Sequence, residues 1–356
     1  MDSPKKFQQF QGLRSVAFFF IFWSHADFLQ KSSISSFYSI TAPAMPTIGV
    51  MVFFVLSGFL TGCKLQPDDS VPNIGGLAFG MRRVKKYYLL HILTMTAVLV
   101  FKLVVIIRDG GDGLWLLLCS VFTQIFLVQS FIPIRSIYFS LNAASWYLSD
   151  YTYLSFLTIP CVKAVKKLFC TGSSVNRKGL AAFVVVLFFV EFIYAFLFRD
   201  NQMAHFLIYI FPPFRFLDYL LGIIIGFLFV SRPEKQINAM NIFTAICCIC
   251  LVAYAWIRLR YILCAPAVCA LIYCLAFSQG TISRILSSKY LVWLGDISLE
   301  AYLFHQIILG GVNLIMGERF LILQAVASLA ITLSAAGITH RYITPRLVKL
   351  TASLKS

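Results

Sequence analysis

The chain has 356 residues, of which 60% are hydrophobic and only 12% are charged, and this composition excludes an ordinary soluble globular domain. Its formal net charge of +16 does not indicate nucleic-acid binding, because the basic residues fall between apolar stretches instead of forming one basic stripe. We therefore expect a membrane protein whose main partner is the lipid bilayer.

Eleven apolar stretches have roughly the ~20 residues that a helix needs to cross the hydrocarbon of a bilayer. They lie at about residues 11–30, 44–63, 84–107, 114–132, 143–162, 180–198, 206–230, 239–257, 261–278, 290–316 and 320–340. These continuous runs lack the in-out alternation of a membrane β-barrel. The sequence predicts an all-α fold, a polytopic transmembrane helical bundle that fills residues 1–356 as a single domain.

The Lys and Arg residues predict how the chain is threaded, since connections rich in positive charge stay in the cytoplasm. Basic clusters near both ends and in the connections at 64–83 and 163–179 place both termini in the cytoplasm, which requires an even number of crossings. One of the apolar stretches must then fail to cross. We expect it to be 114–132, bounded by the helix breakers Gly113 and Pro133, as a re-entrant or interfacial segment beside about ten spanning helices.

The first apolar stretch carries Arg14 and His25, which are eleven positions apart. On a helix this spacing puts both side chains within about 20° of each other and ~16 Å apart along the axis. Titratable groups at bilayer depth are unfavourable unless they face a polar interior, so they are candidates for function. His25 is either a general base that takes a proton from an attacking hydroxyl or a hydrogen-bonding group between helices.

The third apolar stretch begins with a basic cluster that includes Arg83 and Lys86. Residues three apart on a helix lie on one face, and such a pair suits phosphate groups like those on the nucleotide end of coenzyme A. The same cluster is also explained by membrane topology alone.

Three later places combine aromatic and titratable residues. Trp146 lies near the start of the stretch 143–162, where an interfacial or core position and a binding role are both open. Arg215 lies three residues before Asp218, so a structural ion pair and a binding role are both open there. Another stretch contains Tyr302 and His305, and this histidine is either a ligand for substrate or a packing residue with a hydrogen bond.

These residues, in this order, resemble the acyltransferase 3 family of membrane-bound acyltransferases over nearly the whole chain. Gly12-Leu13-Arg14 and His25 are similar to the family's motif in its first span, and the run Phe53 to Leu60 resembles its second span. The small residues Ser57 and Gly58 in this run would allow another helix to approach closely. Lys86 replaces the second Arg of the family's cytoplasmic RxxR feature, which keeps the charge but loses bidentate geometry. The stretches at 146–149, 211–222 and 295–305 also resemble family motifs.

The resemblance implies O-acetyl transfer from cytoplasmic acetyl-CoA to a hydroxyl of a carbohydrate acceptor, such as a surface polysaccharide or a lipid-linked glycan, in a bacterial inner or plasma membrane. It implies no metal. His25 and Arg14 are then the catalytic candidates. Coenzyme binding is expected at Arg14, Arg83 and Lys86, and substrate binding at Trp146, Arg215, Tyr302 and His305.

Two other classes remain open from the sequence. A transporter or channel would use His25, Arg215 and His305 to line a path, although no internal repeat of the kind common in transporters is found. A membrane scaffold or sensor without catalysis also agrees with the composition.

Overall fold

The computed structural model describes residues 7–66, 71, 73–108, 113–172, 174–232, 239–257 and 264–353. Both predicted cytoplasmic termini and part of the connection at 64–83 therefore lie partly or wholly outside the described residues. The α-helices are α1 (Gln8–Ser24), α2 (Ser35–Thr41), α3 (Met45–Leu65), α4 (Gly76–Val84), α5 (Tyr88–Arg108), α6 (Leu114–Ile125), α7 (Arg135–Tyr138), α8 (Trp146–Phe169), α9 (Arg177–Phe198), α10 (Pro212–Val230), α11 (Ala239–Ile257), α12 (Cys264–Phe277), α13 (Thr281–Leu286), α14 (Lys289–Asp296), α15 (Ser298–Met316), α16 (Leu321–Ile338) and α17 (Thr344–Ser353).

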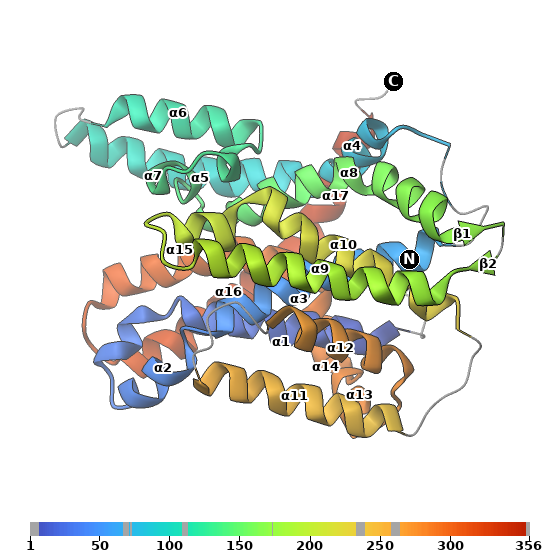
Figure 1. Cartoon of the computed structure of the whole chain (residues 1–356). Coiled ribbons are helices and arrows are strands. Elements are labelled where there is room, and N and C mark those ends of the chain that lie inside the picture. Colours follow the sequence, from blue (N-terminus) through green and yellow to red (C-terminus); the bar gives the residue numbers. More distant parts are fainter. Residues whose placement is uncertain are drawn as a thin grey trace.

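Short elements connect these helices. They are the 3-10 helices η2 (Asp27–Lys31), η4 (Gln129–Phe131) and η5 (Ala143–Ser145), the π-helical turns η6 (Phe206–Ile210) and η7 (Thr339–Ile343), and a two-stranded antiparallel hairpin of β1 (Cys170–Thr171) and β2 (Ser174–Val175). The long helices run side by side along one axis (Figure 1). The prediction of an all-α fold is confirmed, with this hairpin as a small addition.

Six helical segments within the described ranges are long and apolar enough to cross a membrane: α3, α5, α9, Phe206–Val230, α15 and Leu321–Leu350. The predicted count of about ten spans is therefore not supported by length and hydropathy. Helix α1 has only 17 residues and α12 only 14. The apolar part of α11 is short, and α8 contains many polar residues. Several of the apolar stretches predicted from the sequence are longer than the helices, because they include connecting residues that are not helical.

The stretch 114–132 is not one helix. It contains α6 of 12 residues, followed by the turn η4. At 1.5 Å per residue α6 is ~18 Å long, well short of the ~30 Å of hydrocarbon. Helix α6 begins directly after Gly113, whose φ of 91° favours glycine. This length fits the interfacial or re-entrant segment predicted there.

The centre of the molecule is the contact between α3 and α10. Gly58 and Gly62 on α3 face Gly222 and Gly226 on α10, and a Cβ atom at any of these four positions would collide with the backbone of the opposite helix. Two small-xxx-small patterns therefore allow the two backbones to touch. The close approach expected from Gly58 is confirmed.

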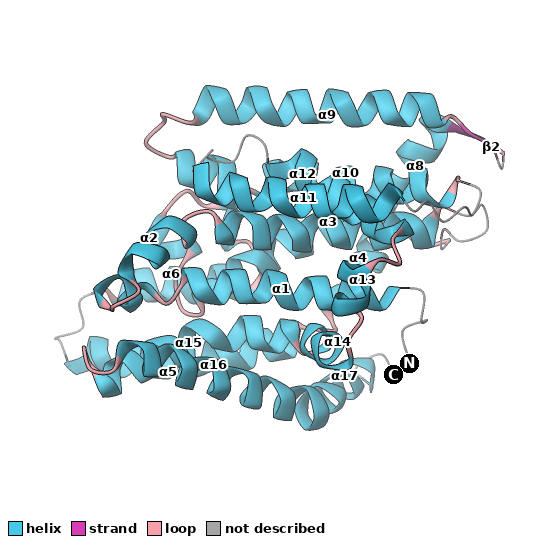
Figure 2. Cartoon of the chain, turned by 90° about the horizontal axis from the view of Figure 1, so that it is seen from below, coloured by secondary structure: helices cyan, strands magenta, loops and turns pink. Residues whose placement is uncertain are grey.

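Helix α1 lies between two layers of the bundle, one containing α3, α10 and α12 and the other containing α5, α15 and α16 (Figure 2). Two glycines bring the short helices α13 and α14 against it. A Cβ at Gly12 would collide with the backbone of Leu286, and one at Gly295 with the backbone of Gln11. This contact fixes the start of α15, which carries the second half of the candidate site.

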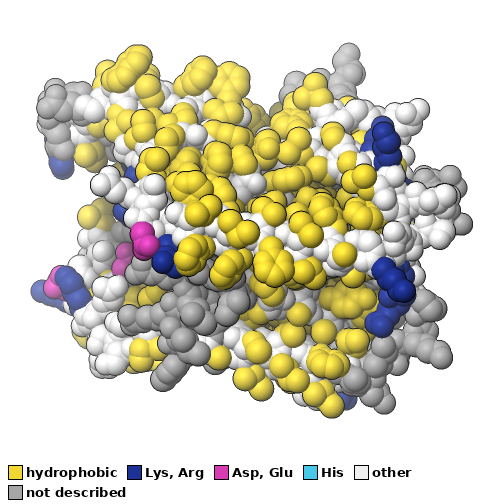
Figure 3. All heavy atoms as spheres, viewed as in Figure 1, with side chains coloured by type: hydrophobic (Ala, Val, Ile, Leu, Met, Phe, Trp, Pro, Cys, Tyr) yellow, Lys and Arg dark blue, Asp and Glu magenta, His cyan; other side chains and the backbone are white. Residues whose placement is uncertain are grey.

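The surface is apolar over the middle of the molecule, and Lys and Arg side chains lie towards its margins (Figure 3). Helix α9, at the front of this view, exposes a row of large side chains that includes Val186, Phe189, Ile193 and Leu197. An exposed apolar surface of this extent fits lipid rather than water. Together with the composition, it indicates an integral membrane protein.

Candidate active site

One stripe of α1 carries Arg14, Ile21 and His25, at the spacing i, i+7, i+11. His25 is the residue that ends the helix, and its backbone N–H donates to Phe22 O at 3.1 Å. Arg14 and Ile21 line one cavity, and His25 lines another. The stripe therefore leads from the first cavity to the second.

The first cavity, here called the tyrosine cavity, has a volume of about 200 Å³. Its walls include Arg14, Phe53, Ser57, Tyr87, Tyr147, Tyr151, Asp296 and Tyr302. The rings of Tyr147 and Tyr151 are stacked with centroids 6.1 Å apart, and Tyr302 meets Tyr147 edge-on at 5.6 Å. A small cavity with aromatic walls and few charged groups suits a thin, mostly apolar chain.

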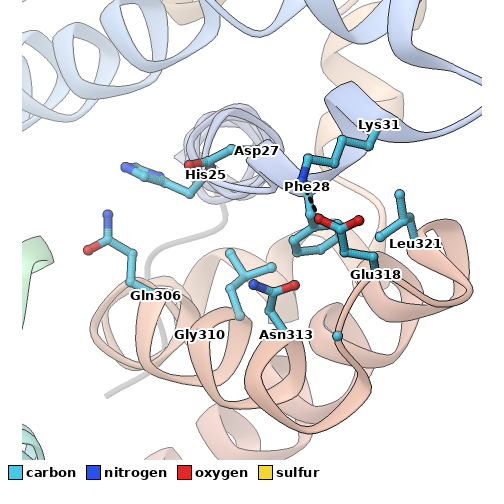
Figure 4. A pocket seen from close by; sticks show the side chains of 11 residues that line it. His25, Asp27, Phe28, Lys31, Gln306, Gly310, Asn313, Glu318 and Leu321 are labelled. Atoms are coloured by element: carbon cyan, nitrogen blue, oxygen red, sulfur yellow. Dashed lines mark hydrogen bonds and ion pairs between the residues drawn. The ribbon is translucent and has the colours of Figure 1, made fainter.

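The second cavity, here called the loop cavity, lies between η2 and the α15–α16 connection and has a volume of about 560 Å³. His25, Asp27, Gln306 and Asn313 give it a polar lining (Figure 4). At its edge Lys31 Nζ donates to Glu318 Oε1, and this hydrogen bond lowers the pKa of the Glu318 carboxyl. Because its lining includes both hydrogen-bond donors and hydrogen-bond acceptors, the cavity suits a hydroxylated ligand.

His25 and His305 meet between the two cavities. His305 is fully buried, and its Nε2 lies 3.3 Å from His25 Nδ1. His25 Nδ1 also lies 2.8 Å from Ile21 O, and His305 Nδ1 lies 2.5 Å from Tyr302 O. The ring centroids are 5.0 Å apart at an interplanar angle of 60°. Two histidines that are 280 residues apart in the sequence thus form one pair.

Helix α15 repeats the order seen on α1. Ser298, Leu299 and Tyr302 line the tyrosine cavity, His305 follows, and the next turns from Gln306 to Asn313 line the loop cavity. In both segments, residues that line the tyrosine cavity come first, the histidine follows, and residues that line the loop cavity come next, in η2 after α1 and in the later turns of α15. The imidazoles lie where the two cavities approach each other.

Arg83 and Lys86 occupy different environments. The Arg83 guanidinium donates from Nη1 to Tyr219 Oη at 2.9 Å and from Nη2 to Thr61 Oγ1 at 2.8 Å, and it lies over the ring of Phe79. Helix α4 ends at Val84, and Lys86 follows in a turn with an exposed side chain. The spacing predicts that both residues lie on one turn of a helix, but the helix ends between them.

Trp146 and Arg215 lie away from both cavities. Trp146 is buried with its ring 5.2 Å from that of Tyr209, and the next residue, Tyr147, faces the tyrosine cavity instead. Arg215 Nη1 is 2.8 Å from Asp218 Oδ2, with both side chains only 1% exposed, and Arg215 Nη2 donates to Ile208 O. Of the predicted substrate-binding residues, only Tyr302 and His305 reach the region of Arg14 and His25.

Several lining residues were not predicted as site residues. Tyr87, Tyr151 and Asp296 come from three different elements, and Gln306 and Asn313 follow His305 on α15. Gln306 and Asn313 had a readable signal, because polar residues interrupt an apolar stretch after a histidine. In the described part of the chain, His, Cys, Asp and Glu do not gather in groups of three that could hold a metal ion.

Comparison with known proteins gives a family. A family model described as an acyltransferase domain matches residues 7–341. Among curated proteins, acyltransferase MdmB from Streptomyces mycarofaciens is 29% identical over 325 residues, which cover 83% of this chain and 79% of that protein. No solved structure matches the chain. Because the family model matches the chain from the start of α1 to η7, this protein belongs to the acyltransferase 3 family and is an acyltransferase.

Proposed function

We propose that this protein is a membrane-bound O-acetyltransferase. It moves an acetyl group from cytoplasmic acetyl-CoA to a hydroxyl of a carbohydrate acceptor, such as a surface polysaccharide or a lipid-linked glycan. The observation that carries this proposal is the position of the His25–His305 pair between two cavities of different character. Membership of an acyltransferase family favours an enzyme over a transporter that would use the same histidines.

The tyrosine cavity suits the acyl end of the donor. Its volume of about 200 Å³ is too small for a whole coenzyme A, but its size and aromatic walls suit the thin pantetheine arm and the thioester. Among the described residues, Arg14 donates from Nη1 to Gln11 Oε1, and its guanidinium has further N–H groups that can bind the donor. The phosphates would remain at the basic end of α4 and the turn that follows it, near Arg83 and Lys86.

The loop cavity suits the acceptor. Its larger volume and its polar groups, including Asp27, Gln306 and Asn313, fit a sugar with several hydroxyls. Phe28 adds an apolar wall against which the carbon face of a sugar ring can pack. An acceptor that enters here reaches His25 from the side opposite to the thioester.

The chemistry needs one base and no further reactant. The neutral imidazole of His25 takes the proton of the acceptor hydroxyl while the hydroxyl oxygen attacks the carbonyl carbon of the thioester. The tetrahedral intermediate then collapses, the C–S bond breaks, and the coenzyme leaves as a thiolate. The imidazolium of His25 returns the proton to the sulfur. The products are an acetyl ester of the acceptor and free coenzyme A.

We further propose an orientation with both chain ends in the cytoplasm of a bacterial cell. If α1, α8, α11 and α12 cross together with the six apolar segments, about ten crossings return the chain to the side where it began. The tyrosine cavity then faces the cytoplasm, where acetyl-CoA is made, and the loop cavity faces outwards.

Radiolabelled transfer in proteoliposomes tests the proposal. Purified protein is reconstituted with a glycan extract from cells that lack it, and [¹⁴C]acetyl-CoA is added. We expect label in the glycan fraction as an ester that mild alkali releases. An alkali-stable product or the absence of label in the glycan, with coenzyme binding intact, would contradict O-acetyl transfer to carbohydrate. Mass spectrometry of surface glycans from cells with and without the protein then identifies the acceptor.

A further inference from the structure

We propose that His305 is a positioning residue, which fixes the tautomer and the orientation of His25 so that His25 Nε2 is the basic atom. This inference rests on the proposed role of His25 as general base. It adds a second histidine that holds the first one and does not itself touch the reacting atoms.

The hydrogen-bond partners of His305 determine its tautomer. His305 Nδ1 lies 2.5 Å from Tyr302 O, and a carbonyl oxygen only accepts, so Nδ1 carries the hydrogen. In a neutral ring the other nitrogen is then an acceptor. His305 Nε2 therefore presents a lone pair to its neighbour, which is His25 Nδ1 at 3.3 Å.

The same reasoning assigns His25. Its Nδ1 lies between two acceptors, Ile21 O at 2.8 Å and His305 Nε2 at 3.3 Å, so Nδ1 carries the hydrogen and shares it between them. The lone pair of the neutral ring is then on Nε2. Without His305, the hydrogen bond to Ile21 O is the one restraint left on the His25 ring among the hydrogen bonds that the described residues make.

The surroundings show why a histidine can serve as this restraint. His305 is fully buried, and its ring lies against those of Phe18 and Tyr302, with centroids 6.2 Å and 5.5 Å away. A neutral imidazole supplies an acceptor without burying a charge in this apolar core, whereas a carboxylate would need compensation. Asp27, the acidic residue nearest His25 in the sequence among those that line the loop cavity, has an exposed side chain and is not among the hydrogen-bond partners of either ring in the described part of the chain.

When His25 takes the acceptor's proton it becomes a cation, and its Nδ1–H becomes a stronger donor. The bond to His305 Nε2 then strengthens as the transition state is approached, which is the condition for a contribution to kcat. The arrangement corresponds to the base and orienting group of a catalytic triad, with imidazole in place of the carboxylate.

Two substitutions at position 305 separate positioning from packing. The amide of His305→Gln places an oxygen near the position of Nε2 and so keeps an acceptor for His25 Nδ1. The amide of His305→Asn lies near Nδ1, so it keeps the bond to Tyr302 O and loses the acceptor. We expect kcat to fall about 10- to 10²-fold in His305→Asn with KM for acetyl-CoA unchanged, and to fall only a few-fold in His305→Gln. The measurement is steady-state transfer by folded, size-homogeneous protein, with His25→Ala as the inactive reference.

The opposite order of the two variants, or equal activity of both, would overturn the positioning role while an inactive His25→Ala leaves the general base in place. An active His25→Ala would instead remove the proposed function itself. Nitrogen-15 NMR of protein labelled at its five histidines tests the geometry without turnover. We expect the wild-type His25 signal, assigned from its loss in His25→Ala, to be that of an Nδ1–H tautomer and to become a mixture in His305→Asn. A mixture already in the wild type would contradict the proposal.

Discussion

At the scale of single residues, the neighbours of a charged side chain show whether it has a structural role or is available to bind a ligand. Arg83 donates to Tyr219 and Thr61, and Tyr219 Oη also meets Thr158 Oγ1 at 2.9 Å. Lys86 is exposed in the turn that follows α4. Arg83 therefore stabilises the contact between helices in addition to any contact with phosphate, whereas Lys86 would contribute to phosphate binding through its charge.

We expect Lys86→Ala to weaken acetyl-CoA binding several-fold at low salt and to leave the melting temperature unchanged. The difference from wild type should shrink as salt rises, because screening removes the contribution of an exposed charge. Arg83→Ala should weaken binding and also lower the melting temperature, since hydrogen bonds to a charged group are worth ~1.5–3 kcal/mol. Titration calorimetry in detergent measures the affinity, with Lys64→Ala as a control lysine. Affinity equal to wild type in both variants would leave the cluster as a topology signal alone.

For Arg215 a structural role and a substrate-binding role lead to different expected results. Its ion pair with Asp218 is buried on both sides, and it lines neither cavity. Removing the cation leaves the buried Asp218 carboxyl without its counter-charge, and breaking a buried ion pair in this way costs ~3–5 kcal/mol. We expect Arg215→Ala to lower the yield of folded protein and its melting temperature strongly, and the double variant Arg215→Met with Asp218→Leu to recover much of the loss. A stable single variant with a raised KM for the acceptor would restore the substrate-binding role that the sequence suggests.

At the scale of elements, close helix contacts hold the site in place. Gly58 on α3 and Gly222 on α10 lie where the two backbones touch, whereas Gly311 on α15 has open space around its Cβ direction. An alanine at either of the first two positions forces the helices apart, and overpacking of this kind costs ~1–3 kcal/mol. We expect Gly58→Ala and Gly222→Ala to lower the melting temperature by several degrees and Gly311→Ala to leave it unchanged or raise it slightly. Equal stability of all three variants would show that the α3–α10 contact is loose.

Local patterns in the sequence predicted elements better than they predicted spans. The run that contains Gly58 predicted a close helix contact, and Gly113 with Pro133 marked an apolar stretch that forms no long helix. The number of spans was less predictable, because hydropathy does not show where a helix such as α1 or α12 begins and ends. The turn at residues 85–87 puts Lys86 beyond the end of the helix that carries Arg83, and it contains no proline or glycine from which the sequence could have predicted it.

At the scale of the whole molecule, the site depends on contacts that spacing within one helix cannot reveal. The stripe of Arg14 and His25 was readable, because one helix carries both residues. The partner of His25 was not, since α15 comes beside α1 only through packing that involves α3, α13 and α14. The burial of Trp146 and Arg215 outside both cavities likewise depends on neighbouring helices, so the sequence left a structural and a binding role open for each.

The orientation of the bundle can be tested on its two ends. The end of α8 with the β1–β2 hairpin lies at the same end as the start of α1, and the α9–α10 connection lies at the other end (Figures 1 and 2). In a background without the ten native cysteines, we expect a cysteine at Lys166 to resist an impermeant thiol reagent added to intact cells. A cysteine at Asp200, which is exposed in the α9–α10 connection, should be labelled. Labelling at position 166 and protection at position 200 would reverse the map.

The central claim is that His25 is the base of the transfer reaction, and its most direct test is the specific activity of purified, size-homogeneous His25→Ala alongside its acetyl-CoA affinity. Loss of a general base typically costs ~10²–10⁴-fold in rate. The donor contacts that we propose lie in the tyrosine cavity, which His25 does not line, and near Arg83 and Lys86. We therefore expect turnover to fall by at least two orders of magnitude, with coenzyme affinity and melting temperature close to wild type. Turnover within a few-fold of wild type, with binding retained, would contradict the mechanism.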